Sequence, residues 1–285
     1  MKFKRNRRAI SPIVAIILMF VLTMAAIGIS LVYMYPSING FKDKSYNNSN
    51  NLYFVALDAT IQGLVNNPPP GDKQFYFNQD NGEISVDSSW LTYFILKDVT
   101  GAQNVLLFQE NITRIVHRST AVADYGEGEH RYIVGPENQD YMFLNGSSTL
   151  YNEIAIINAT RSVYESSYLD LALYYRYVLS TQYITEGATE IYNLDIINLK
   201  FLLNETSIDR STQQFVTMQL NYLGTEKQEL EEISFINDIY SEVRVLNGVG
   251  FFQFEYPLYY PAHPGFISHL IRVNIINMLV SVTIT

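Results

Sequence analysis

The chain contains no cysteine among its 285 residues, which excludes a disulfide, a thiolate metal site and a cysteine nucleophile. Tryptophan occurs once, histidine four times, and only 16% of the residues are charged. No two histidines have the H-E-x-x-H spacing of a zinc site, and neither a P-loop nor a G-x-S-x-G elbow occurs. The sequence therefore predicts a protein that is not an enzyme, with no metal, no cofactor and no catalytic residues.

The histidines have no spacing typical of a ligand set, and we interpret them as scattered surface residues: His117, His130, His263 and His269. His263 and His269 could approach each other, but their separation in the sequence does not establish a site. Glu127, Glu129 and His130 could form a carboxylate–histidine cluster. Glycines within this segment favour a solvated loop instead.

The basic residues are distributed unevenly. The net charge is -9, yet five of the 19 basic residues lie within the first eight positions, where no acid occurs. The rest of the chain has 14 basic against 28 acidic residues. A body of that charge repels nucleic acid, so we expect no nucleic-acid partner. The basic cluster instead indicates membrane topology, with the N-terminus in the cytoplasm.

A long uncharged run follows the basic residues. Residues 9–41 carry no charge, and the apolar part of this run covers 10–35. As a helix at about 1.5 Å per residue it would be roughly 39 Å long, which exceeds the ~30 Å hydrocarbon core of a bilayer. The apolar region of a cleaved secretory signal is only about 7–15 residues long. The run therefore predicts a single membrane span, with the C-terminal domain extracellular.

The junction between the two parts reads Arg7-Arg8-Ala9-Ile10-Ser11-Pro12. It resembles the class III signal peptide of archaeal type IV pilins and archaellins. That resemblance implies a prepilin peptidase as a partner, which would cut between Ala9 and Ile10 and remove the leader 1–9. Pro12 would then lie in the first helical turn, where its missing N–H costs nothing, with Ser11 as the N-cap. A plain signal anchor is the alternative interpretation.

Four small residues in the apolar run would allow neighbouring helices to approach closely: Ala25, Ala26, Gly28 and Ser30. Ala26 and Ser30 form a small-xxx-small pair. The resemblance implies that this helix packs against other pilin-like subunits in a filament core. The alternative is that membrane helices in general contain more small residues.

The segment after the apolar run has two interpretations. Residues 42–51 are polar and rich in asparagine, and they could be a linker or a continuation of the helix. The predicted helix, 10–65, could therefore be broken near 36–51. Beyond that point, helical spacing recurs in one row of apolar residues, namely Phe54, Leu57, Ile61 and Leu64.

Residues 66–285 are rich in Tyr, Phe and β-branched residues, with frequent turn signals. Asn81-Gly82 predicts a hairpin between the strands on either side of it. Residues 169–178 read as one strand, whereas 226–239 could be a short helix. The predicted fold class is α+β, a long apolar helix followed by a β-rich, sandwich-like extracellular head of one or two domains. The resemblance implies an immunoglobulin-like head.

Five N-glycosylation sequons occur, a small excess over the roughly three expected by chance. Their asparagines are Asn47, Asn111, Asn145, Asn158 and Asn204. Glycans would suit a head on the cell surface.

Together these features favour a minor type IV pilin-like surface filament subunit, held in the cell membrane by its helix before assembly. The acidic, tyrosine-rich head would serve adhesion. The alternative is a membrane-anchored extracellular binding or adhesion protein that never polymerises. The sequence does not specify the ligand of the head.

Overall fold

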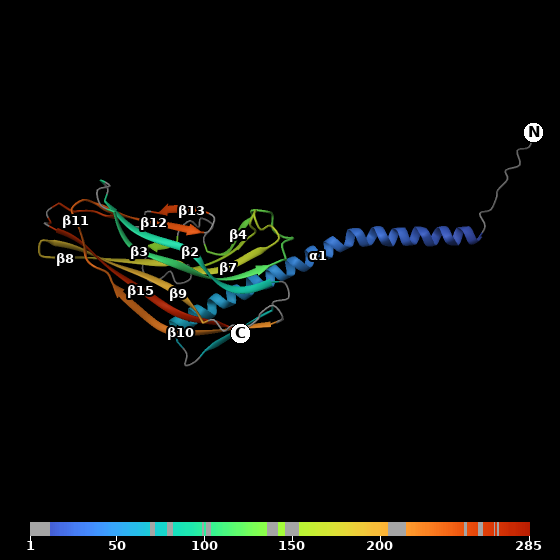
Figure 1. Ribbon diagram of the computed structural model, residues 1–285, viewed down its shortest axis with the longest axis horizontal. Helices are drawn as coiled ribbons and strands as arrows, with labels where there is room; N and C mark the ends of the chain where they lie inside the picture. The colour runs from blue at the N-terminus through green and yellow to red at the C-terminus, as the bar shows by residue number, and fades with distance from the viewer. Residues whose placement is uncertain are drawn as a thin grey trace, which may run out of the picture.

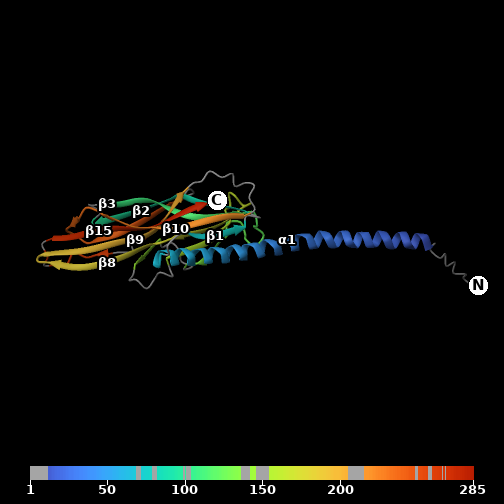
Figure 2. The same cartoon turned by 90° about the horizontal axis from the view of Figure 1, so that it is seen from below.

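The computed structural model describes residues 12–68, 72–78, 82–98, 100, 104–135, 142–145, 154–204, 215–247, 250–255, 259–264, 266 and 268–285. A single long helix, α1 (Pro12–Asn66), precedes a β-rich head. The second half of α1 lies along the head, and the first half projects from it into solvent (Figures 1 and 2). The predicted α+β class, with an apolar helix before a β-rich region, is confirmed.

The strands of the head form two sheets. The first has the order β1 (Lys73–Asn78), β10 (Phe215–Glu229), β15 (Ser268–Ile284), β9 (Thr189–Asn204), β8 (Tyr177–Glu186) and β5 (Phe143–Asn145), and β11 (Ile233–Phe235) also pairs with β15. The second has the order β13 (Gly250–Glu255), β12 (Ile239–Asn247), β2 (Gly82–Asp98), β3 (Asn104–Ser119), β7 (Leu169–Tyr175), β6 (Ala155–Thr160) and β4 (His130–Val134), and β14 (Tyr259–Tyr260) also pairs with β12.

Most neighbouring strands are antiparallel, but β9 and β15 run parallel from Ser268↔Thr189 to Thr283↔Asn204. Along β15, burial alternates with a period of two, as a strand with one face toward a core requires. Both hydrophobic clusters of the head combine residues of the two sheets, and one of them also includes the helix. The two sheets therefore share their cores, and α1 completes one of these cores.

The second half of α1 is amphipathic. Its buried residues recur every three or four positions, as the sequence predicted, and are 0–2% exposed: Phe54, Leu57, Ile61 and Leu64. They pack with residues of β1, β7, β10 and β15 in one cluster. The predicted helix over this segment is confirmed.

The break considered near 36–51 is absent, because α1 is continuous through Pro36 and through the polar segment 42–51. One face of that segment contacts the head at intervals of four residues. Asp43 accepts a hydrogen bond from the Ala123 N–H, and Asn47 donates one to the Ala121 carbonyl. Their spacing places these side chains on one side of the helix, so the head stabilises a segment whose own helix propensity is low.

Three local predictions were wrong. β1 pairs with β10 whereas β2 pairs with β3 and β12, so the strands before and after Asn81-Gly82 belong to different sheets and do not form the predicted hairpin. The strand expected over 169–178 is divided at Arg176, where the chain again passes from one sheet to the other. Residues 226–239 contain the end of β10 and all of β11 rather than a helix.

Candidate functional site: the projecting helix and its junction with the head

Residues 16–39 of α1, in the part that projects from the head, are all exposed. From Ile16 onward, its large apolar side chains are 49–80% exposed as far as Phe41, on every side of the helix. The most apolar window has a mean hydropathy of 2.5, and none of it is buried. By length and composition this helix could be a membrane span. A signal sequence near the N-terminus would have the same length and composition. Water is a poor solvent for such a surface.

The four small residues predicted for helix packing lie within this bare part of α1. Gly28 has open space around the position of a Cβ atom, so another helix could approach its backbone there. The predicted peptidase residues Arg7, Arg8, Ala9, Ile10 and Ser11 lie outside the described residues. Pro12 is the first described residue and lies in α1.

Three residues spaced by four along α1 join the helix to the loop between β3 and β4. The Asp43 Oδ2 atom lies 3.3 Å from the Ala123 nitrogen, and the Asn47 Nδ2 atom lies 3.0 Å from the Ala121 oxygen. Asn51 bonds to the side chain of Tyr125, which is itself buried. This row was not predicted, although polar residues spaced by four along a helix lie on one face.

A buried carboxylate lies farther along the same helix. Asp58 is 8% exposed, and it accepts hydrogen bonds from the Tyr175 hydroxyl at 2.7 Å and from Gln62 at 3.0 Å. Burial raises the pKa of the Asp58 carboxyl, and these hydrogen bonds, which act in the opposite direction, do not cancel that effect. Asp58 therefore forms a polar contact between α1 and β7 within an otherwise apolar interface.

Asp58→Asn is expected to gain stability relative to the unchanged chain as the pH rises from about 4 to about 7. Because the pKa of Asp58 is higher in the folded than in the unfolded chain, the unchanged chain loses stability as the carboxyl ionises over this interval. Asparagine does not ionise, and its Oδ1 atom still accepts a hydrogen bond from Tyr175. Chemical denaturation at both pH values measures the difference in unfolding free energy between the two chains. The same difference at pH 4 and pH 7 would contradict the prediction.

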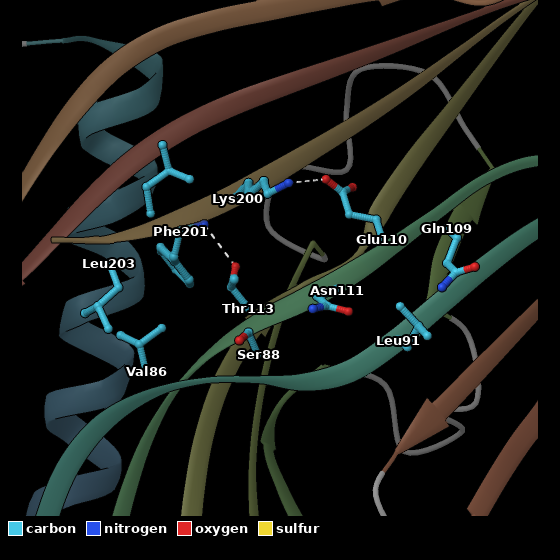
Figure 3. A pocket seen from close by; sticks show the side chains of 11 residues that line it. Val86, Ser88, Leu91, Gln109, Glu110, Asn111, Thr113, Lys200, Phe201 and Leu203 are labelled. Atoms are coloured by element: carbon cyan, nitrogen blue, oxygen red, sulfur yellow. Dashed lines mark hydrogen bonds and ion pairs between the residues drawn. The ribbon is translucent and has the colours of Figure 1, made fainter. Parts of the chain in front are cut away.

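The head contains a cleft of about 630 Å³ between β2, β3 and β9 (Figure 3). Val86, Phe201 and Leu203 form its apolar end, and Glu110 with Lys200 forms an ion pair on its polar side. The Phe201 N–H donates to the Thr113 hydroxyl at 3.0 Å, which links β9 to β3. Because Lys200 neutralises Glu110, this lining suits an uncharged ligand with polar and apolar parts. No motif signals the cleft, because its walls are distant in sequence.

The structure separates the sequons into accessible and inaccessible ones. Asn47 is 4% exposed and Asn158 is 3% exposed, and their amide nitrogens bond to Ala121 and His130. A glycan on either is incompatible with these contacts. Asn111 is exposed on β3 at the cleft. Asn145 and Asn204 end strands, and their side chains lie outside the described residues.

The interpretation of all four histidines as surface residues was wrong for two of them. His117 and His269 are 3% and 6% exposed, and burial lowers the pKa of His117 to about 4. His130 and His263 are exposed. The cluster considered around Glu129 and His130 does not form, because Glu129 bonds to the Gly126 N–H and Arg131 whereas His130 bonds to Thr160.

A polar network that the sequence did not predict lies at the end of the head farthest from the projecting half of α1. The Glu190 carboxylate is completely buried and accepts hydrogen bonds from Tyr183 at 2.6 Å, His263 at 2.5 Å and His269 at 2.6 Å. Burial acts to raise the pKa of Glu190, but the hydrogen bonds outweigh it and the pKa is lowered. Among the described residues, no three His, Asp or Glu side chains are arranged to hold a metal ion.

No protein-family model, no curated protein and no solved structure matches this chain.

Proposed function

We propose that the chain is a type IV pilin-like surface subunit, inserted in the cell membrane through α1 and then assembled with other copies or related subunits. One observation carries the proposal. A single continuous helix is apolar and bare on all sides over residues 16–41, and it is built into the core of a folded head from Phe54 onward. A cleavable signal alone would not need to be continuous with the core of the head.

The bare half of the helix requires an apolar environment on every side. A bilayer provides one, and a bundle of the same helices provides another. Ala26 and Ser30 would let two such helices approach closely in that bundle. We infer that the membrane is the first environment of this helix, and that a helical filament core is the second.

The orientation follows from charge. The five basic residues before the helix would stay in the cytoplasm, so the head would be extracellular. We further propose that the two sheets form a sandwich-like head, which has no catalytic role and contacts surfaces or ligands outside the cell. The exposed Asn111 is the described sequon best placed to carry a glycan there.

The mature N-terminus tests this proposal. Mass spectrometry of the protein from its native host is expected to find Ile10 as the first residue, because a prepilin peptidase would remove residues 1–9. Replacing Arg8 and Ala9 together by leucine is expected to leave the leader attached. Replacing Lys2 and Lys4 by serine is the control, since these lie away from the junction, and processing should continue. An intact Met1, or an N-terminus beyond Ala26, would refute the proposal.

The cleft between β2, β3 and β9 favours a second candidate function. A cleft of about 630 Å³ is large enough for a small ligand. The chain could then be an anchored extracellular binding protein that never polymerises. Electron microscopy of the host surface discriminates the two, because labelled filaments support the subunit and label confined to the membrane supports the anchored binder.

A further inference from the structure

The head begins almost where the uncharged part of the helix ends. Phe41 is the last residue of the uncharged run, and Asp43, two residues later, already contacts the head. At about 1.5 Å per residue the helix from 12 to 41 is about 45 Å long, close to the ~40–45 Å thickness of a bilayer with its headgroups. An inserted helix would therefore leave no spacer between the head and the lipid surface.

Two loops form the base of the head, at the end from which α1 emerges (Figure 1). Residues 120–129 contact Asp43 and Asn47 of the helix. Residues 161–168 are fastened to that first loop through Arg161, whose Nη1 atom lies 2.5 Å from the Tyr125 carbonyl oxygen. The Gly128 N–H also donates to the Arg161 carbonyl at 2.9 Å. The second loop is thus held close to where the helix leaves the head.

The second loop presents apolar side chains to solvent. Val163 is 64% exposed and Tyr164 is 85% exposed, although most residues of this size in the head are buried. A hydrogen bond from the Tyr164 N–H to the Ser162 hydroxyl, at 3.1 Å, supports the turn that carries them. Tyrosine has an apolar ring with a polar tip, and it is enriched where hydrocarbon meets headgroups.

The charges around this loop do not favour an ionic partner. Arg118 forms ion pairs with Glu165 and Asp170, and Arg131 does so with Asp124 and Glu129. The chain outside its first eight residues is acidic, which disfavours attraction to an anionic surface. Arg161, the cation of the loop itself, is held by the backbone carbonyl oxygens of Ser166 and Tyr125. The loop therefore offers contact through the exposed side chains of Val163 and Tyr164.

We propose that Val163 and Tyr164 form a second membrane contact, in which the loop 161–168 rests in the headgroup layer of the outer leaflet beside the inserted helix. The inference depends on the proposed insertion of α1, which places this loop next to lipid. Two attachment points would fix the tilt of the head relative to the bilayer, whereas α1 alone would leave this tilt free to vary.

The single native tryptophan makes a direct test feasible. In the full-length chain with Trp90→Phe, one variant adds Tyr164→Trp and a matched control adds Ile236→Trp. Ile236 is 87% exposed, nearly equal to Tyr164, but it follows β11 at the far end of the head (Figure 1). Both chains are reconstituted into phosphatidylcholine vesicles whose acyl chains carry bromine just below the headgroups. We expect the quenched fraction of fluorescence to be at least about twice as large for the tryptophan at 164.

Equal quenching of the two tryptophans in vesicle-bound protein would overturn the proposal. Quenching at 164 that changes with the protein-to-lipid ratio instead of the bromine content would also overturn it, because a second copy would then cover the loop. Failure of both chains to float with vesicles would instead refute the insertion of α1. Circular dichroism and thermal unfolding of each variant must match the Trp90→Phe chain.

Discussion

A chain that begins at residue 42 is expected to be soluble and folded, while the full-length chain stays in the membrane fraction. The bare part of α1 contributes no buried surface to the head, because its most apolar window is 0% buried. Its removal deletes the exposed apolar surface proposed to enter the membrane and leaves the cores intact. Flotation with vesicles measures partitioning, and thermal unfolding without detergent should show one cooperative transition.

A longer truncation provides the control. A chain that begins at residue 67 also lacks the four buried residues of the second half of α1, each worth about 1.5–3 kcal/mol of burial. Their sum, about 6–12 kcal/mol, is comparable to the whole stability of a typical domain, so this chain should aggregate or unfold. A soluble, cooperatively folded 67–285 chain, or a 42–285 chain that remains with lipid, would contradict the division of α1 into two parts.

Leu57→Ala is expected to destabilise the head by about 2–5 kcal/mol. Leu57 is 0% exposed and packs where α1 meets both sheets, so alanine would remove apolar contacts and leave a cavity that the surrounding strands cannot close. Urea denaturation of the 42–285 chain would measure the loss as a lower midpoint with an unchanged slope.

Leu52→Ala is the matched substitution on the opposite face of the helix. Leu52 is 71% exposed, so the same change should alter the unfolding free energy by no more than about 0.5 kcal/mol. Helix propensity is nearly equal in the two cases, since both replace leucine by alanine. Equal effects at 52 and 57 would mean that the helix contributes no packed face to the head.

The parts of the fold that follow local rules could be predicted from the sequence. The apolar run and the row formed by Phe54, Leu57, Ile61 and Leu64 depend on composition and on a period near 3.6, and the structure has both within α1. The polar segment 42–51 could not be assigned, because its helix is stabilised by hydrogen bonds from a loop about 75–80 positions away in the sequence.

The errors arose where partners distant in sequence decide the structure. Asn81-Gly82 has the residues of a tight hairpin, but β1 finds its partner in β10 and β2 finds its partners in β3 and β12. Asn47 and Asn158 have the sequon pattern, but tertiary contacts bury them. The Glu190 network and the cleft each join residues 73–90 positions apart in the sequence, so neither leaves a short motif.

The parallel pairing of β9 and β15 affects the order in which the parts of this chain can fold. β15 is the last strand in the sequence, yet it lies inside its sheet between β10 and β9. Contacts of such long sequence separation form late and slowly. The buried face of α1 is among the first segments synthesised, and the strand that completes its core is the last. An exported chain would therefore pass through a stage in which that face is synthesised but uncovered, when a chaperone or the lipid surface could shield it.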